Sequence, residues 1–64
     1  MSPKEIKKYK ENGVPQSVID FTIKFLQDNN YKLFNLAMLD NKEFRIMFTN
    51  HSGWTDARIF KISE

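Results

Sequence analysis

Residues 43–62 have the sequence EFRIMFTNHSGWTDARIFKI, in which apolar and polar side chains alternate on both sides of an Asn-His-Ser-Gly segment. Alternation with a period of two predicts β-strands, and the glycine-containing segment between them predicts the turn of a β-hairpin. A chain of 64 residues has too little helix to cover both faces of a sheet. One face of this hairpin is therefore expected to be hidden by the twist of the sheet or covered by another molecule.

Length and composition predict one small domain with a dense core. A single domain of 64 residues buries only about 60% of the surface that its unfolded chain exposes. Cysteine is absent, which excludes disulfides and thiolate metal sites, and the single histidine, His51, cannot build a zinc site alone. No metal or cofactor is expected. Hydrophobic residues make up 41% of the chain, with six Phe, two Tyr and one Trp, and aromatic side chains bury the most area per residue.

The charge pattern does not favour a nucleic-acid partner. The formal net charge is +2, and the lysines of the first helix lie beside Glu5 and Glu11. Such a mixture is typical of a solvated helix face rather than of a basic arm. No apolar run approaches membrane-spanning length, and the charged N-terminus does not resemble a secretory signal. We expect a soluble cytoplasmic protein with no membrane partner.

Capping residues delimit a short first helix. Ser2 is a typical N-cap, Pro3 suits the first helical position, and Glu5 stands where a capping box places its acid. Gly13 fits the left-handed position after the helix, and Pro15 prevents its continuation. Because most of its residues are charged, this helix must dock on another element to persist.

A longer and more apolar helix is predicted from about Pro15 or Ser17 to Asp28. Ser17 and Asp20 repeat the capping pattern. Its apolar residues cover an arc of roughly 200°, which is wider than a surface helix needs. These residues are Val18, Ile19, Phe21, Ile23, Phe25 and Leu26. We expect this helix to organise the core, with the sheet on one flank and the first helix on the other.

Residues 31–39 are apolar at both odd and even positions, which predicts a central strand or one buried on both faces. Asp40-Asn41-Lys42 supplies the turn that follows. A two-residue loop would mix polarity on each face, and a slip of one residue inverts every side chain, so we favour a three-residue loop. The pairs it predicts are Phe34–Phe48, Leu36–Ile46 and Met38–Phe44.

The second hairpin is predicted to turn through a four-residue loop, Asn50 to Gly53. The pairs this loop predicts are Phe48–Thr55, Ile46–Ala57 and Phe44–Ile59. In that register Phe60 and Ile62 lie on the outer face. A bulge near Arg58 would instead turn both of them inward, and the sequence leaves the two arrangements open.

The four-residue register gathers side-chain types on the outer face that are typical of protein interfaces. The candidate partner-binding residues are Arg45, Met47, Trp54, Arg58 and Phe60. Metal-ligand clusters, glycine-rich phosphate loops and nucleophile motifs are absent from the sequence, so an enzyme is not expected. The profile matches small inhibitors and modulators, including those carried by phages and mobile elements, by analogy alone.

The segment from Gly13 to Ile19, GVPQSVI, provides an alternative. It resembles the turn and the start of the recognition helix in helix-turn-helix proteins of the phage repressor and Cro type. The resemblance implies that the glycine makes the turn, that Gln16 and Ser17 contact base edges, and that Ile19 packs inward. The aromatic and basic side chains predicted on the sheet face are a second nucleic-acid surface to consider.

Together these patterns predict a single α+β domain over residues 1–64: two N-terminal helices, one of them short, packed on one face of a three-stranded antiparallel β-meander. The favoured function is non-catalytic binding that modulates or inhibits a larger protein through the open sheet face. A homodimer through the sheet is a second use of the same face. The alternative is a small nucleic-acid-binding protein.

Overall fold

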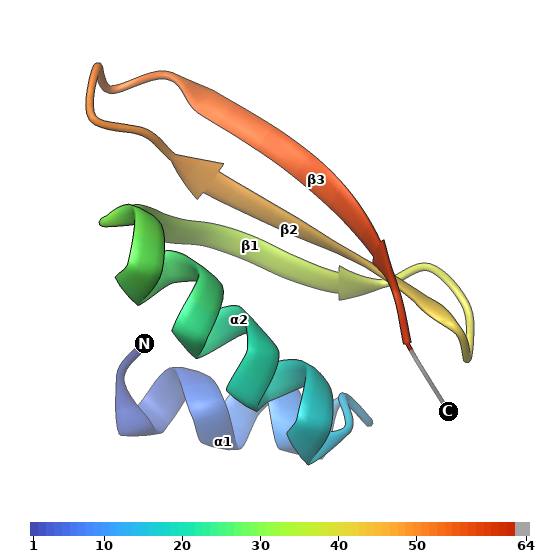
Figure 1. The fold of residues 1–64 in the computed structure, drawn as a ribbon. Helices are drawn as coiled ribbons and strands as arrows, with labels where there is room; N and C mark the ends of the chain where they lie inside the picture. Colours follow the sequence, from blue (N-terminus) through green and yellow to red (C-terminus); the bar gives the residue numbers. More distant parts are fainter. Residues whose placement is uncertain (63–64) are drawn as a thin grey trace.

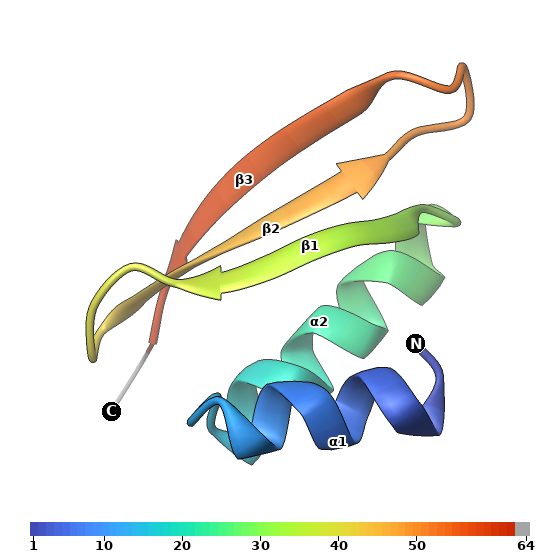
Figure 2. The ribbon, with the colours of Figure 1, turned by 180° about the vertical axis from the view of Figure 1, so that it is seen from behind.

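Two helices precede three strands in the computed structural model, which describes residues 1–62. The elements are α1 (Pro3–Glu11), α2 (Gln16–Asn29), β1 (Lys32–Met38), β2 (Glu43–Thr49) and β3 (Thr55–Lys61). The strands form an antiparallel sheet in the order β1-β2-β3, and both helices lie on one face of it (Figures 1 and 2). The predicted α+β arrangement is confirmed. Within the described residues, no helix is long and apolar enough to cross a membrane.

Both ends of α1 follow the predicted capping chemistry. The Ser2 hydroxyl accepts from the Glu5 N–H at 3.3 Å, and the Glu5 carboxylate accepts from the Ser2 N–H at 3.1 Å. Gly13 has a φ of +88°, and the Val14 N–H donates to the Tyr9 carbonyl at 3.0 Å. This backbone pattern closes the helix and folds Val14 back, so that Tyr9 and Val14 are both buried. The short, charged helix is thus anchored by its C-terminal turn.

The start of α2 differs from the prediction. Pro15 is the N-cap, and no side chain caps the first turn, so the expected cap by Ser17 and Asp20 is wrong. Proline fixes φ near −65°, and Pro15 at φ −61° and ψ 149° has the extended conformation of an N-cap residue. Helical residues therefore begin at Gln16, and Ser17 is already inside the helix. The Asp20 carboxylate instead accepts from the Gln16 amide at 2.9 Å.

The core lies between α2 and the covered face of the sheet. Among the apolar residues predicted to be buried from α2, the structure buries Val18, Ile19 and Leu26, whereas Phe21 is 44% exposed. Thr22 is also fully buried and was not predicted. The strands contribute Leu36, Phe44, Ile46 and Phe48. α2 thus organises the core as expected, although its buried residues cover a narrower arc of the helix than predicted.

The central strand is β2, so the prediction of a central strand at residues 31–39 is wrong. Along β2 buried and half-buried residues alternate without exception, because one face of the strand packs on the helices and the other does not. β1 is an edge strand, and its mixed polarity accompanies an irregular pairing. Leu33, not Phe34, pairs with Phe48, and the register shifts between Leu33 and Asn35. Phe34 is the extra residue of this bulge and is 63% exposed.

The first hairpin otherwise has the predicted register. Met38 pairs with Phe44 and Leu36 pairs with Ile46, as a three-residue loop requires. The Leu39 N–H donates to the Glu43 carbonyl at 2.9 Å and closes that loop. Matching the apolar faces was sufficient here, because Phe44, Ile46 and Phe48 make one face of β2 clearly more apolar than the other.

The second hairpin is shifted by one residue from the prediction. The observed pairs are Phe48–Asp56, Ile46–Arg58 and Phe44–Phe60. The Asn50 N–H donates to the Trp54 carbonyl at 2.9 Å, so three residues form the loop, and Gly53 takes a φ of +82°. This is the three-residue hairpin in which a turn is followed by a left-handed glycine. Phe60 and Ile62 consequently face the helices, although β2 and β3 pair without the bulge that was considered near Arg58.

Candidate functional site

The face of the sheet opposite the helices is the candidate site, and β2 defines its centre. Residues paired directly across antiparallel strands lie on the same face. Arg45 pairs with Ala37 of β1 and with Ile59 of β3, which makes one row across the sheet. A second row contains Met47 and Ala57 and ends on β1 at Asn35, whose side chain accepts from the Tyr9 hydroxyl of α1 at 3.5 Å and so does not belong to the uncovered face. We call the other five residues the outer face.

The outer face is largely apolar and open to solvent. Ile59 is 60% exposed, and Arg45 and Met47 are only half-buried. Both helices lie on the other side of the sheet, so no helix covers these rows (Figure 2). Glu43 pairs with Lys61 at one end of the same face and supplies charge there. An apolar centre with charged residues at its end is the composition of a protein-binding patch.

Arg45 occupies the middle of this face and has a hydrogen-bond donor without an acceptor. Its Nε atom is buried, and no acceptor among residues 1–62 lies within hydrogen-bond distance of it. Its flanking residues, Ala37 and Ile59, are apolar and offer no side-chain acceptor. A buried donor left without a partner costs about 1–3 kcal/mol. An acceptor supplied by a bound molecule would remove that cost once the Arg45 side chain turns to expose Nε.

The structure separates the five residues predicted to bind a partner. Arg45 and Met47 lie on the outer face, as expected. Trp54 lies at the end of the β2–β3 loop and is 73% exposed. Arg58 and Phe60 lie on the helix-covered side, because they pair with the buried residues of β2. The predicted set is therefore not one surface.

The reason for this correction is the length of the second loop. Asn50 accepts hydrogen bonds through its side chain from the Ser52 and Trp54 N–H groups, at 3.0 and 3.1 Å. Together with the left-handed Gly53, these bonds fix a loop one residue shorter than the predicted four. Sequence reasoning consequently missed Ile59 as an outer-face residue. An Asn followed three positions later by Gly was the available signal.

Phe60 belongs instead to an aromatic cluster between β3 and α2. Its ring centroid lies 4.8 Å from that of Phe21, 5.4 Å from Phe25 and 5.6 Å from Phe44. Arg58 lies over the Phe25 ring, with its guanidinium carbon 5.9 Å from the centroid. Such ring contacts stabilise the fold beyond simple burial. Arg58 and Phe60, which were predicted to bind a partner, therefore pack β3 against α2.

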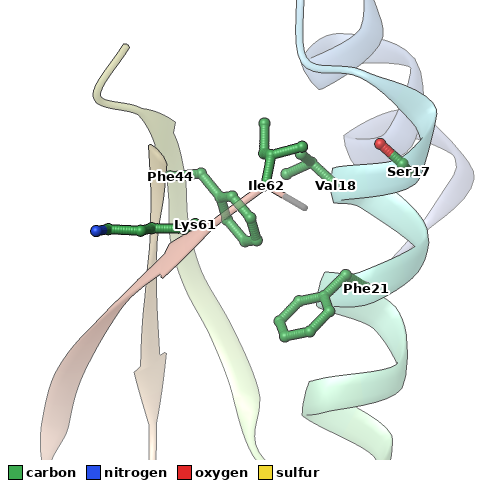
Figure 3. Close-up of a pocket in the computed structure, with 6 residues that line it drawn as sticks. All are labelled: Ser17, Val18, Phe21, Phe44, Lys61 and Ile62. Atoms are coloured by element: carbon green, nitrogen blue, oxygen red, sulfur yellow. The ribbon is translucent and has the colours of Figure 1, made fainter. Parts of the chain in front are cut away.

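A small cleft opens at the edge of this aromatic cluster. Figure 3 shows Val18, Phe44 and Ile62 directed toward one another between helix and strand, with Phe21 beside them and Lys61 pointing away. The cleft measures about 200 Å³. Its lining offers the hydroxyl of Ser17 but no convergent set of titratable groups. Its size and lining suit a small apolar group.

The helix-turn-helix resemblance points to Gln16 and Ser17, and both are exposed in the first turn of α2. Gln16 is engaged with Asp20 through its side-chain amide. Most of the length of α2 is covered, since Val18, Ile19 and the residues one and two turns later pack inward. The exposed side of α2, which includes Gln16, Ser17 and Lys24, is therefore the part free to contact another molecule.

The described part of the chain holds no grouping suited to metal chemistry. Within residues 1–62, no three His, Cys, Asp or Glu side chains are placed together to hold an ion. Comparisons with models of protein families, with curated proteins and with solved structures each found no match.

Proposed function

We propose that this chain is a small non-catalytic interaction protein that binds a larger protein through its outer face. The observation that carries this proposal is an uncovered apolar sheet face centred on Arg45, whose buried Nε has no acceptor among the described residues. Ile59 on that face is exposed to solvent in the monomer, so its side chain offers apolar area to a partner. Binding that modulates or inhibits the target is the role in keeping with so small a chain.

The composition of the outer face supports a protein partner. Methionine and arginine are enriched at the centres of protein interfaces, and Met47 and Arg45 occupy the centre here. Methionine also adapts its shape to irregular surfaces. A carboxylate or carbonyl oxygen on the partner would complement the guanidinium of Arg45. Glu43 and Lys61, which pair at one end of the face, would form part of the rim.

Nucleic-acid binding has less support from the same surface. A nucleic-acid site needs several cations along a phosphate track and aromatic rings for stacking. The outer face has Arg45 as its central cation, whereas Arg58 and Phe60 lie on the other side of the sheet. The first turn of α2, next to Gln16 and Ser17, holds no basic residue. Retention on heparin at physiological salt that is lost as salt rises further would support this alternative.

Site-directed photo-crosslinking tests the proposal in lysate from the source cells. A photoreactive residue at Ile59 should capture a specific protein, and the same residue at Lys24, which is exposed on α2, should not capture it. Met47→Lys should abolish the capture at position 59, since it places a charge in the apolar centre of the face. Gln27→Lys adds the same charge to an exposed helix position and should leave the capture intact.

Two results would contradict the proposal. Equal capture from positions 59 and 24 would mean that the outer face is not selective. Capture that survives Met47→Lys in a folded variant, as judged by circular dichroism, would mean that the partner binds elsewhere. Crosslinks between two copies of this chain have twice the mass of one chain, which distinguishes them from capture of a larger protein.

A further inference from the structure

The outer edge of β3 is a regular and uncovered strand edge in the described part of the molecule. β3 ends the sheet, and no element of residues 1–62 lies beyond it (Figure 1). All residues from Thr55 to Ile59 are exposed. The pairing with β2 is continuous along the strand, so no bulge twists this edge away. A regular, uncovered edge is a template for pairing with another strand.

Two hydrogen bonds determine which backbone groups of β3 point away from β2 and are free at this edge. The Asn50 N–H donates to the Trp54 carbonyl, and the Ile62 N–H donates to the Lys42 carbonyl at 2.6 Å. Bonded and non-bonded positions alternate along an antiparallel strand, so even-numbered positions of β3 face β2. The positions whose N–H and C=O groups face outward are Thr55, Ala57, Ile59 and Lys61.

Two opposite charges flank the middle of the edge. Asp56 and Arg58 share one face of β3, and neither forms an ion pair with any of residues 1–62. The Asp56 carboxylate accepts from the Ala57 N–H at 2.8 Å. Arg58 rests over the Phe25 ring, and both charged residues are exposed. The edge therefore presents a negative and a positive side chain on either side of Ala57.

We propose that two copies of this chain associate through antiparallel pairing of their β3 strands, with Ala57 at the two-fold axis. In this register each Asp56 lies opposite the Arg58 of the second copy, and each Thr55 lies opposite Ile59. Thr55, Ala57 and Ile59 are outward-facing positions, so they form the hydrogen-bonded pairs of the new ladder. Asp56 and Arg58 then occupy the non-hydrogen-bonded pair, in which side chains lie closest. The product is a continuous six-stranded sheet.

Charge selects this register from its neighbours. Residues directly opposite each other must share a face, so the two nearest alternatives are centred on position 56 or position 58. The first opposes two Asp56 carboxylates, and the second opposes two Arg58 guanidinium groups, both of which are unfavourable. Only the pairing about Ala57 is complementary. In it the Asp56 carboxylate leaves the Ala57 N–H for the guanidinium, and that N–H takes the carbonyl of the second Ala57.

This association goes beyond the proposed function, because it joins a second copy through the backbone edge of β3, whereas the proposed function uses outer-face side chains and a larger protein. Ala57 and Ile59 belong to both surfaces, but pairing of the edges leaves their side chains on the open side of the sheet, and the charged residues Asp56 and Arg58 lie on the other side. Either surface can therefore be disabled without the other, and the two proposals fail separately.

Sedimentation analysis of the purified chain from about 10 µM to about 1 mM tests the dimer. Wild type should shift from monomer to dimer. Asp56→Arg and Arg58→Asp should each raise the dissociation constant at least about tenfold, since each turns two attractive pairs into repulsive ones. An equimolar mixture of the two variants should dimerise again, because position 56 of each then opposes an opposite charge at position 58 of the other. Lys32→Asp, on the other edge strand, is the matched control and should dimerise like wild type.

Ala57→Pro provides a second route if a charge variant fails to fold. Proline at this position removes an N–H that faces the free edge and not the β2 ladder, so the monomer should stay folded while the dimer weakens. Wild type that stays monomeric throughout the range overturns the proposal. So does a folded charge variant that dimerises like wild type, or a mixture of folded variants that remains monomeric.

Discussion

The two faces of the sheet are built from the same strands but differ in what covers them. On β2, Ile46 is fully buried beneath α2, while its neighbours Arg45 and Met47 are half-buried on the outer face. Neighbouring residues of one strand thus have different surroundings because the helices lie on one side of the sheet. We infer that the helix-covered face holds the fold together and that the outer face is free to serve binding. Matched substitutions on the two faces test this inference.

The largest contrast is expected between two isoleucines. Ile46→Ala removes a fully buried side chain and should lower the free energy of unfolding by about 3–4 kcal/mol, through lost burial and an unfilled cavity. Ile59→Ala, at a residue that is 60% exposed, should cost less than about 1 kcal/mol. Urea unfolding at constant m-value measures both. Similar losses at the two positions would mean that the outer face is also part of the core.

Two phenylalanines test the observed register. Phe60→Ala removes a half-buried ring that contacts three others and should cost about 2–3 kcal/mol. Phe34→Ala, at the exposed bulge of β1, should cost less than about 1 kcal/mol. Thermal unfolding followed by circular dichroism compares them. The reverse order would support the pairing predicted from the sequence, in which Phe34 is buried and Phe60 is outside.

The sequence was sufficient wherever a single rule applied. The capping box at Ser2 and the left-handed Gly13 are local backbone chemistry, and both are as predicted. The register of the first hairpin followed from matching faces, because Phe44, Ile46 and Phe48 all lie at even positions of β2 and Met47 is the strand's only apolar residue at an odd position. The same pattern placed Arg45 and Met47 on the outer face correctly.

Prediction failed where two choices had similar polarity. In β3, Ala57 and Ile59 are apolar at odd positions, and Phe60 and Ile62 are apolar at even ones, so matching faces cannot choose a loop length. The choice is made by the Asn50 side chain and by the positive φ of Gly53. The bulge at Phe34 depends on how β1 fits the helices, which is a tertiary property that alternation does not encode.

A smaller effect is expected from the polar residue at the centre of the outer face. Arg45→Met keeps an aliphatic stem of similar length and removes a buried Nε that has no acceptor among the described residues. The free energy of unfolding should rise by up to about 1 kcal/mol, because an unsatisfied donor disappears. Capture of the larger partner should weaken at the same time. A marked loss of stability would mean that Arg45 has a structural role within the monomer.

The smallest effect is expected from the polar residue of the covered face, because its hydrogen bond is already made. Thr22 is fully buried, and its hydroxyl donates to the Val18 carbonyl at 2.7 Å. Thr22→Val keeps the shape and the helix propensity, and it leaves that carbonyl with its ordinary helical partner, so the free energy of unfolding should change by less than about 0.5 kcal/mol. Thr22→Ala is the control and should cost about 1–2 kcal/mol, since it opens a cavity beneath the sheet. A loss from Val as large as that from Ala would show that the hydroxyl, and not the packing, is what this position contributes to the covered face.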